Sequence, residues 1–140
     1  MTLVPVRILV VDDDRAVLAG FLGCETAELA FTHNCTEAMN FVANGLDLKA
    51  GDEVILTNQE HPGGYSCWRL KAARYGINVR EVEIPVTPRD PGELASRLID
   101  AIGPKTRVLS FSGITTHTGL QMPVREICDA AREKGVLTLV

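Results

Sequence analysis

Aromatic residues are scarce in this sequence, and basic residues are spread without forming a stripe. The 140 residues include one Trp, two Tyr and four Phe, and we expect Trp68, Tyr65, Tyr75 and Phe41 to be packing residues rather than a recognition stripe. The net charge is −4, from 14 basic and 18 acidic side chains. This balance argues against nucleic acid or an anionic membrane as the main partner.

Clustered cysteines and long apolar runs are also missing. Cys24, Cys35, Cys67 and Cys128 lie far apart, with no C-x-x-C pair and no clustered histidines. The spacing predicts neither a metal site nor a disulfide framework, so we expect reduced thiols in a cytoplasmic protein, with Cys67 buried rather than nucleophilic. The apolar stretch of residues 8–11 is too short for a signal-peptide core or a membrane span.

What the chain does have is the composition of an ordinary globular protein, with 46% hydrophobic and 23% charged residues. Its apolar residues alternate between the spacing of strands and the spacing of helices. The predicted strands cover residues 6–11, 28–32, 53–57, 78–84, 107–111 and 136–140. The predicted helices cover residues 16–22, 36–46, 64–75 with Gly76 as the C-cap, 90 or 92 to 102 with Asp90 or Gly92 at its start, and 123–134.

This alternation predicts an α/β fold of three layers, in which helices cover both faces of a mostly parallel sheet, because parallel strands need crossover helices. Residues 1–15 are predicted to form a strand and a helix cap of uncertain origin, with the cap at Asp12, Asp13 and Asp14, and residues 16–140 form the main domain. The strand at 136–140 ends the chain before the loop in which this fold class builds its site. We therefore expect the natural protein to continue.

Polar loops follow three of the predicted strands, at residues 33–37, 58–64 and 112–119, and they contain all three histidines. In an open α/β sheet, ligands bind outside the carboxyl ends of the strands. Three polar loops at one sheet edge, two of which contain glycines, predict a binding site more strongly than any one of them does.

The first of these loops leads directly into a helix, where free backbone N–H groups and the helix dipole favour an anion. Cys35 and Thr36 are therefore candidates for holding a phosphate, because a Thr hydroxyl adds a further donor. The alternative is structural: Asn34 or Thr36 caps the helix, and Glu37 supports its first turn.

In the second loop, His61 precedes Pro62, Gly63 and Gly64. A ring at such a turn can stack on a planar cofactor or move protons, which makes His61 the candidate catalytic residue. The alternative is a surface histidine beside two glycines that only supply turn geometry.

Three segments, in this order and spacing, resemble the class V aminotransferase family of fold type I pyridoxal-phosphate enzymes, which includes cysteine desulfurases and isopenicillin N epimerase-like proteins. They are ELAFTHNCTEAMNFVANGL, KAGDEVILTNQEHPGG and TRVLSFSGITTHTGLQMPVREICDAAREKGVLTLV, within residues 16–140. The resemblance implies the front part of the large domain of such an enzyme. The complete enzyme is then expected to use pyridoxal 5'-phosphate, to act on an amino acid and to form a homodimer.

The resemblance also implies roles for single residues. It places Cys35 and Thr36 at the helix start that binds the cofactor phosphate, His61 where the family stacks a histidine on the pyridine ring, and Thr116 where the family often has an asparagine near the phenolic oxygen. The family's aspartate for the pyridine nitrogen and its Schiff-base lysine come after residue 140. The chain alone is therefore expected to be inactive, with transamination, desulfuration, epimerisation and elimination all open for its parent.

Two other interpretations are possible. ILVVDDDRAVL resembles the opening of a two-component receiver domain, in which paired acidic residues bind magnesium, although Thr57 and Asn58 stand where a receiver needs its phosphate-accepting Asp. The chain is otherwise a non-catalytic α/β domain that binds a phosphate ligand at the helix start without performing chemistry.

Overall fold

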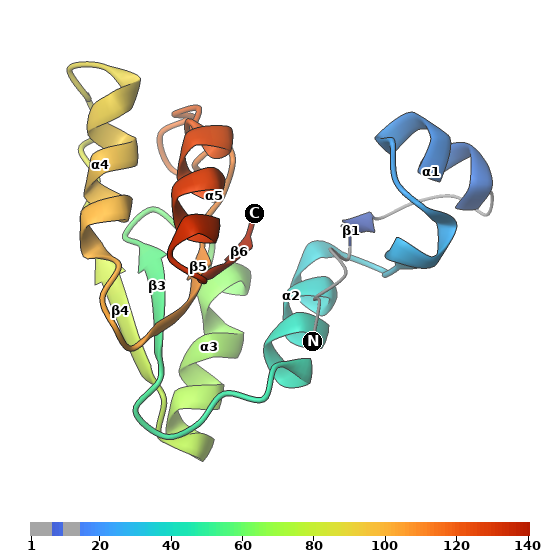
Figure 1. Cartoon of the computed structure of the whole chain (residues 1–140), viewed down its shortest axis with the longest axis horizontal. Coiled ribbons are helices and arrows are strands. Elements are labelled where there is room, and N and C mark those ends of the chain that lie inside the picture. Colours follow the sequence, from blue (N-terminus) through green and yellow to red (C-terminus); the bar gives the residue numbers. More distant parts are fainter. Residues whose placement is uncertain (1–6, 10–14) are drawn as a thin grey trace. The chain divides into compact units, whose positions relative to one another are not determined.

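The computed structural model describes residues 7–9 and 15–140 of the chain (Figure 1). Contacts divide the chain into two compact units, Met1–Val42 and Ala43–Val140, and the boundary falls inside helix α2 (Cys35–Gly45). The predicted cap at Asp12, Asp13 and Asp14 lies outside the described residues. The predicted domain boundary after residue 15 stays a prediction.

The first unit contains a two-stranded parallel sheet, in which β1 (Arg7–Leu9) pairs with β2 (Leu29–Phe31). Helix α1 (Arg15–Leu22) and the short 3-10 helix η1 (Thr26–Glu28) connect the two strands. α1 ends because Gly23 adopts a left-handed conformation, with φ of 64°, which residues other than glycine rarely do. Helix α2 (Cys35–Gly45) then begins within the first polar loop, one residue before the predicted start at residue 36.

The second unit contains a four-stranded parallel sheet in the order β4-β3-β5-β6. Its strands are β3 (Glu53–Thr57), β4 (Asn78–Val82), β5 (Thr106–Ser110) and β6 (Leu137–Leu139). All three strand pairs are parallel, so the predicted parallel sheet is confirmed.

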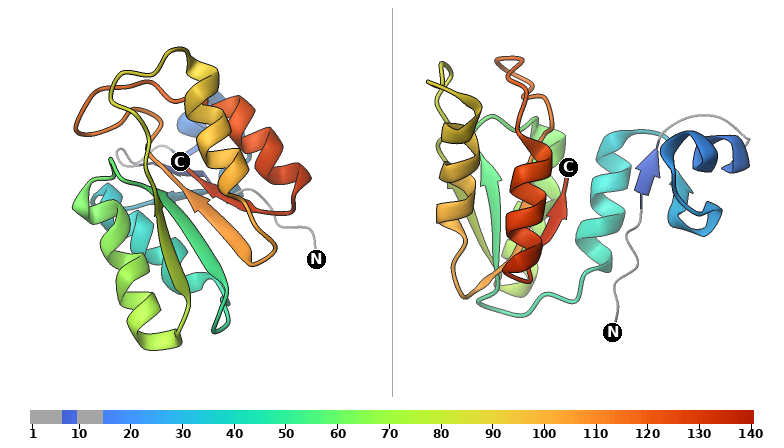
Figure 2. Two further views of the ribbon diagram at one scale, coloured as in Figure 1. Left: turned by 90° about the vertical axis from the view of Figure 1, so that its left-hand side faces the viewer. Right: turned by 45° about the horizontal axis from the view of Figure 1, so that its top comes forward.

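Helices cover both faces of this sheet. Helix α3 (Pro62–Tyr75) lies on one face, and α4 (Pro91–Ala101) and α5 (Val124–Glu133) lie on the other (Figures 1 and 2). The prediction of three layers is therefore confirmed for this unit. No helix in the described part of the chain is long and apolar enough to cross a membrane.

The central strand β3 is buried on both faces, which explains its continuous apolar run. Val54, Ile55 and Leu56 are all fully buried. Because side chains alternate along a strand, Ile55 packs into the cluster beneath α4 and α5 while its two neighbours face α3. The members of that cluster are Ile55, Ile84, Leu94, Ala95, Leu98, Leu109, Phe111, Met122, Ile127, Ala131 and Val136.

Two of the predicted helix ends have the expected chemistry. Asp90 caps α4, because its Oδ1 accepts the N–H of Glu93 at 3.0 Å. Gly76 ends α3 with φ of 71°, and its N–H donates to the carbonyl of Ala72. The residue type thus predicts the helix cap at both positions.

The prediction that the aromatic residues are packing residues is confirmed in part. Trp68 is fully buried, but Phe41 is 59% exposed and Tyr75 is 57% exposed. The prediction is therefore wrong for these two rings. Cys67 is buried, as expected for a thiol on the covered face of α3.

Charged pairs gather at the amino edge of the four-stranded sheet. Arg80 pairs with Glu53 at 3.3 Å, and Arg107 pairs with Asp52 at 3.1 Å. The hydroxyl of Thr106 also donates to Glu53. The amino edge is thus held by ion pairs that are partly exposed to solvent.

Candidate functional site

The candidate site of the second unit lies at the point where the connections of the sheet diverge. From β3 the chain passes to β4 on one side, and from β5 it passes to β6 on the other side. In open α/β sheets, the crevice between two such diverging loops is the usual ligand position. The loops after β3 and β5 are two of the three that the sequence singles out.

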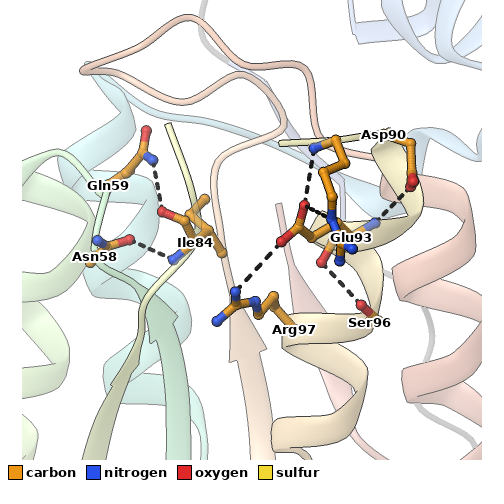
Figure 3. A network of polar contacts seen from close by, with 8 residues as sticks. Asn58, Gln59, Ile84, Asp90, Glu93, Ser96 and Arg97 are labelled. Carbon is orange, nitrogen blue, oxygen red and sulfur yellow. Dashed lines mark hydrogen bonds and ion pairs between the residues drawn. The ribbon is translucent and has the colours of Figure 1, made fainter. Parts of the chain in front are cut away.

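Asn58 and Gln59 tie the exit of β3 to the exit of β4. The Asn58 Oδ1 accepts the N–H of Ile84 at 3.0 Å, and the Gln59 Nε2 donates to the carbonyl of Ile84 at 3.3 Å (Figure 3). Side chains therefore satisfy both backbone groups of Ile84, just beyond the last residue of β4. They replace the ladder bonds that a longer strand would make.

Gln59 also reaches the loop after β5. The hydroxyl of Thr118 donates to the Gln59 Oε1, and the hydroxyls of Thr118 and Thr115 lie 2.7 Å apart. Thr115 in turn closes a small hairpin, because its backbone N–H donates to the carbonyl of Leu120 and its Oγ1 accepts the N–H of Leu120, both at 2.9 Å. Gly119 turns this hairpin with φ of 68°.

Glu60 joins the same two loops by a second route. Its Oε1 accepts the hydroxyl of Thr57 at 2.5 Å and the N–H of Ser112 at 3.2 Å, and its Oε2 accepts the hydroxyl of Ser112 at 2.7 Å. Glu60 is only 7% exposed. The three residues before His61 thus form a clasp, by which we mean the side chains of Asn58, Gln59 and Glu60 with their partners on the neighbouring strand exits.

His61 is the N-cap of α3, and it lies directly after this clasp. Its Nδ1 accepts the N–H of Gly63 at 3.0 Å, and its carbonyl accepts the N–H of Gly64 at 2.7 Å. An acceptor at Nδ1 places the proton of the neutral ring on Nε2. The His61 side chain is exposed, so the ring has a fixed tautomer and open surroundings.

In the alternative interpretation, Gly63 and Gly64 only supply turn geometry beside a surface histidine. Both lie in the first turn of α3, and neither has a positive φ. A Cβ at Gly64 would lie 3.7 Å from Oε2 of Glu60, which is ordinary contact. The N–H of Gly63 serves as the donor to the imidazole instead.

Thr116 lies on the hairpin after β5 and is exposed, next to the buried Thr115. The structure brings the loops of His61 and Thr116 together through the bonds of Glu60 to Ser112 and of Gln59 to Thr118. The contact of Thr116 with a cofactor stays a prediction.

Cys35 and Thr36 form the start of α2 in the first unit, and both are exposed. Asn34 caps the helix, because its Oδ1 accepts the N–H of Glu37 at 2.9 Å. The helix cap of the structural alternative is therefore present, and it uses the N–H of Glu37. The N–H groups of Cys35 and Thr36 come earlier in the first turn and have no intrahelical partners. The prediction that the three polar loops form one binding site concerns residues of both units, and it stays a prediction.

Glu37 also takes part in the start of α2. Its Oε2 accepts the N–H of His33 at 2.7 Å and lies 3.0 Å from Nδ1 of the same residue. The backbone N–H of His33, and then its ring, lower the pKa of Glu37 below its ordinary value. The first turn therefore carries a carboxylate on its His33 side.

None of the four lysines lies on the carboxyl-edge loops of the second unit. Lys71 is buried in α3, where its Nζ donates to the carbonyls of Ala43 at 2.6 Å and Leu46 at 2.5 Å. Lys134 donates to the carbonyl of Ile99, and Lys49 pairs with Asp47. Lys49, Lys105 and Lys134 precede β3, β5 and β6, which places them toward the amino edge.

An open groove of about 770 Å³ lies beside the base of the hairpin. It shares only this base with the candidate site, because its lining includes neither His61 nor Thr116. The lining residues are Gly113, Ile114, Gln121, Met122, Pro123, Val124, Arg125, Glu126 and Asp129. No group of three or more metal-ligating side chains occurs within residues 7–9 and 15–140.

The sequence interpretation overlooked the residues that hold the site in place. It named the loops, and Asn58 only as a position of the receiver alternative, but it gave no role to Gln59, Glu60, Ser112, Thr115 or Thr118. A signal was available: Asn58, Gln59 and Glu60 are three consecutive polar residues between a fully buried strand and a helix cap. Two of them, Gln59 and Glu60, are buried, and buried polar side chains need hydrogen-bond partners.

Comparison with known proteins identifies relatives over nearly the whole chain. A family model described as aminotransferase class V matches residues 8–140, including the segment that resembles a receiver opening. Isopenicillin N epimerase of Streptomyces clavuligerus is 37% identical over 126 residues, which is 90% of this chain and 32% of that protein. A probable cysteine desulfurase of Methanothermobacter thermautotrophicus is 35% identical over 127 residues, which is 90% of this chain and 30% of that protein.

A solved structure gives the same result. A mutant of the cystine C–S lyase C-DES, with glycine covalently linked to its PLP cofactor, matches with a TM-score of 0.79 and 32% identity. The match covers 89% of this chain and 32% of that chain. This chain thus spans about a third of the length of the relatives it matches.

Proposed function

This chain belongs to the aminotransferase class V family, and we propose that it is the front part of the large domain of a pyridoxal-phosphate-dependent enzyme that acts on amino acids. The observation that supports this most is the position of His61. It caps α3 where the sheet connections diverge, with an exposed ring whose tautomer is fixed by the N–H of Gly63.

The exposed polar groups fit the chemistry of that cofactor. A phosphate suits the first turn of α2, where the backbone N–H groups of Cys35 and Thr36 and the Thr36 hydroxyl are the available donors. A flat pyridine ring suits the exposed imidazole of His61. When bound, the cofactor would supply an electron sink for bond cleavage at the α-carbon of an amino acid.

In this proposal each residue of the chain has a limited task. Thr36 binds the phosphate, and His61 stacks on the ring and keeps water from one face of it. Thr116 lies near the phenolic oxygen, where its hydroxyl can donate a hydrogen bond. The Asn34 cap leaves room for the first task because it engages only the N–H of Glu37.

We also propose that the chain alone is inactive. Covalent attachment of this cofactor requires a lysine beside the site, and the four lysines of the chain are engaged or placed elsewhere. Lys71 is buried with two carbonyl partners, for example. The parent enzyme, for which we propose a homodimer, would carry out transamination, desulfuration, epimerisation or elimination.

Binding of pyridoxal 5'-phosphate to the chain tests the proposal, with equilibrium dialysis and absorbance as readouts. We expect Thr36→Val and His61→Ala to weaken binding by roughly tenfold each, because each removes one contact of about 1.4 kcal/mol. Thr26→Val and His117→Ala are the matched controls, since both positions are exposed and outside the proposed contacts. Equal binding by all four variants would contradict the assignment.

Borohydride reduction tests the proposed inactivity separately. The chain is mixed with pyridoxal 5'-phosphate, reduced and digested, and labelled lysines are found by mass spectrometry. We expect only scattered labelling of exposed lysines, with Lys71 protected by burial. A stoichiometric adduct at one lysine, together with turnover of an amino acid, would show that the chain is active by itself.

A further inference from the structure

Glu60 is a buried carboxylate held by neutral donors. It is 7% exposed, and no Lys, Arg or His pairs with it among the residues that the structure describes. Its three hydrogen bonds come from the hydroxyl of Thr57 and from the N–H and hydroxyl of Ser112. Burying a carboxylate is costly, and at the amino edge of the same sheet the acidic residues have arginine partners.

The buried carboxylate fixes the position of two loops. A carboxylate is the only side-chain group that offers acceptors alone on two oxygens, and Glu60 uses both on Ser112 while one also bonds Thr57 within its own loop. The exit of β3 is thereby fixed to the exit of β5 by two hydrogen bonds, and the bond to Thr57 fixes the Glu60 side chain to the end of β3. Satisfied buried networks of this kind make the local backbone rigid.

His61 is the next residue in the chain, and its ring depends on that backbone. The imidazole stays in place only if the peptides from Glu60 to Gly64 keep Nδ1 within reach of the Gly63 N–H, at 3.0 Å. The same turn is closed by the bond from the Gly64 N–H to the His61 carbonyl. A loosened Glu60 would free the turn and let the ring change tautomer and direction.

We propose that Glu60 is a positioning residue, which fixes the imidazole of His61 by clamping the β3 exit onto Ser112. That this ring then serves a bound pyridine ring rests on the proposed function. The clamping itself does not, because it concerns contacts within this chain. Glu60 touches none of the proposed cofactor-binding groups and acts only through His61.

The test measures the imidazole nitrogens of His61 by nitrogen-15 NMR at about pH 8, where a free imidazole is neutral. In the unmodified chain we expect distinct shifts, with the proton on Nε2. In Glu60→Ala we expect the two shifts to converge, and hydrogen exchange of the Gly63 amide to accelerate by roughly tenfold. Glu60→Gln is the conservative variant: its amide oxygen can accept from Thr57 and the Ser112 N–H while its amide donates to the Ser112 hydroxyl, so we expect His61 to remain fixed.

Ile127→Val serves as the stability control, because it should lower stability beneath α5 without moving the His61 signals. Should Glu60→Ala fail to fold, Ser112→Ala carries the test, with a smaller convergence of the same shifts expected. Unchanged His61 nitrogens and unchanged Gly63 exchange in a folded Glu60→Ala or Ser112→Ala chain would overturn the proposal. A chain that binds no pyridoxal 5'-phosphate but shows these shifts would refute the proposed function and leave the role of Glu60 standing.

Discussion

Glu60 holds Ser112 by two hydrogen bonds, one to its N–H at 3.2 Å and one to its hydroxyl at 2.7 Å. The two residues are 52 positions apart in the sequence, and they join the exits of neighbouring parallel strands at the edge where α/β folds bind ligands. The opposite edge is held by Arg80 and Arg107 with their acidic partners. Ion pairs thus join the strands at the amino edge of the sheet, and hydrogen bonds to the Glu60 carboxylate join them at the carboxyl edge.

The first prediction concerns the stability contributed by this pair. Ser112→Ala removes one donor from a buried carboxylate, so we expect the free energy of unfolding to fall by about 1–3 kcal/mol. Ser96→Ala is the control, because Ser96 donates to the carbonyl of Glu93 from an exposed position (Figure 3) and should change stability by about 0.5 kcal/mol or less. Urea unfolding measures both, and equal losses would mean that the Ser112 hydroxyl contributes nothing special.

The second prediction concerns Lys71, which caps the last turn of α2 from within α3. Its Nζ bonds to the carbonyls of Ala43 and Leu46 satisfy helix-end acceptors that would otherwise lack partners. We expect Lys71→Met to lower the free energy of unfolding by about 2 kcal/mol, since hydrogen bonds to charged groups are lost while the aliphatic stem keeps its packing. Lys105→Met is the exposed control, and a Lys71→Met chain as stable as the control would contradict this role.

Much of the fold could be predicted from the sequence, because strand periodicity and helix capping depend on residues close together in the chain. The strand predicted at residues 53–57 matches β3 in both bounds, and its centre at residues 54–56 is apolar because a strand buried on both faces needs no polar face. Asp90 and Gly76 are found at the cap positions they predict, because capping depends on neighbours three or four residues away.

Polar contacts between residues far apart in the sequence could not be predicted in this way. The bond of Gln59 to Thr118 joins residues 59 positions apart, and nothing in the local pattern pairs these two side chains. Trp68 and Tyr75 show the same limit for burial: both lie on α3, yet one is fully buried and the other 57% exposed. Strand order and helix rotation decide such outcomes, and a single periodic pattern does not specify them.

The third prediction concerns the relative reactivity of two thiols. Burial raises the pKa of the Cys67 thiol, so at a given pH a smaller fraction of it is the reactive thiolate. Cys35 is exposed at the start of α2. We expect iodoacetamide at about pH 8 to modify Cys35 well before Cys67, as followed by peptide mass spectrometry. The difference should disappear in urea, and faster labelling of Cys67 in the folded chain would contradict its burial.

The fourth prediction concerns the acid sensitivity of the starts of α2 and α4, where a first-turn glutamate accepts the backbone N–H of the residue four positions before it. The backbone N–H of Arg89, then its guanidinium, and finally Arg97 lower the pKa of Glu93 below 4.5. Figure 3 shows Glu93 with Arg97. His33 lowers the pKa of Glu37 in a similar way. A carboxyl whose folded pKa is depressed stabilises the fold above its unfolded pKa and loses that contribution as the pH falls through the folded value. The stabilisation should therefore be complete above about pH 5 and should fade below 4.5.

Carbon-13 NMR of the Glu93 carboxyl measures this directly, with the same carboxyl in the urea-unfolded chain as the reference. Because the backbone N–H of Arg89 is the largest cause, Arg89→Ala should keep most of the depression and lose only the part due to the guanidinium. A full return to the unfolded value in Arg89→Ala would show that the ion pair at 3.1 Å, rather than the backbone donor, controls Glu93. If the pKa of Glu93 in the unmodified chain equals that in the unfolded chain, Glu93 does not contribute to the acid sensitivity of the fold.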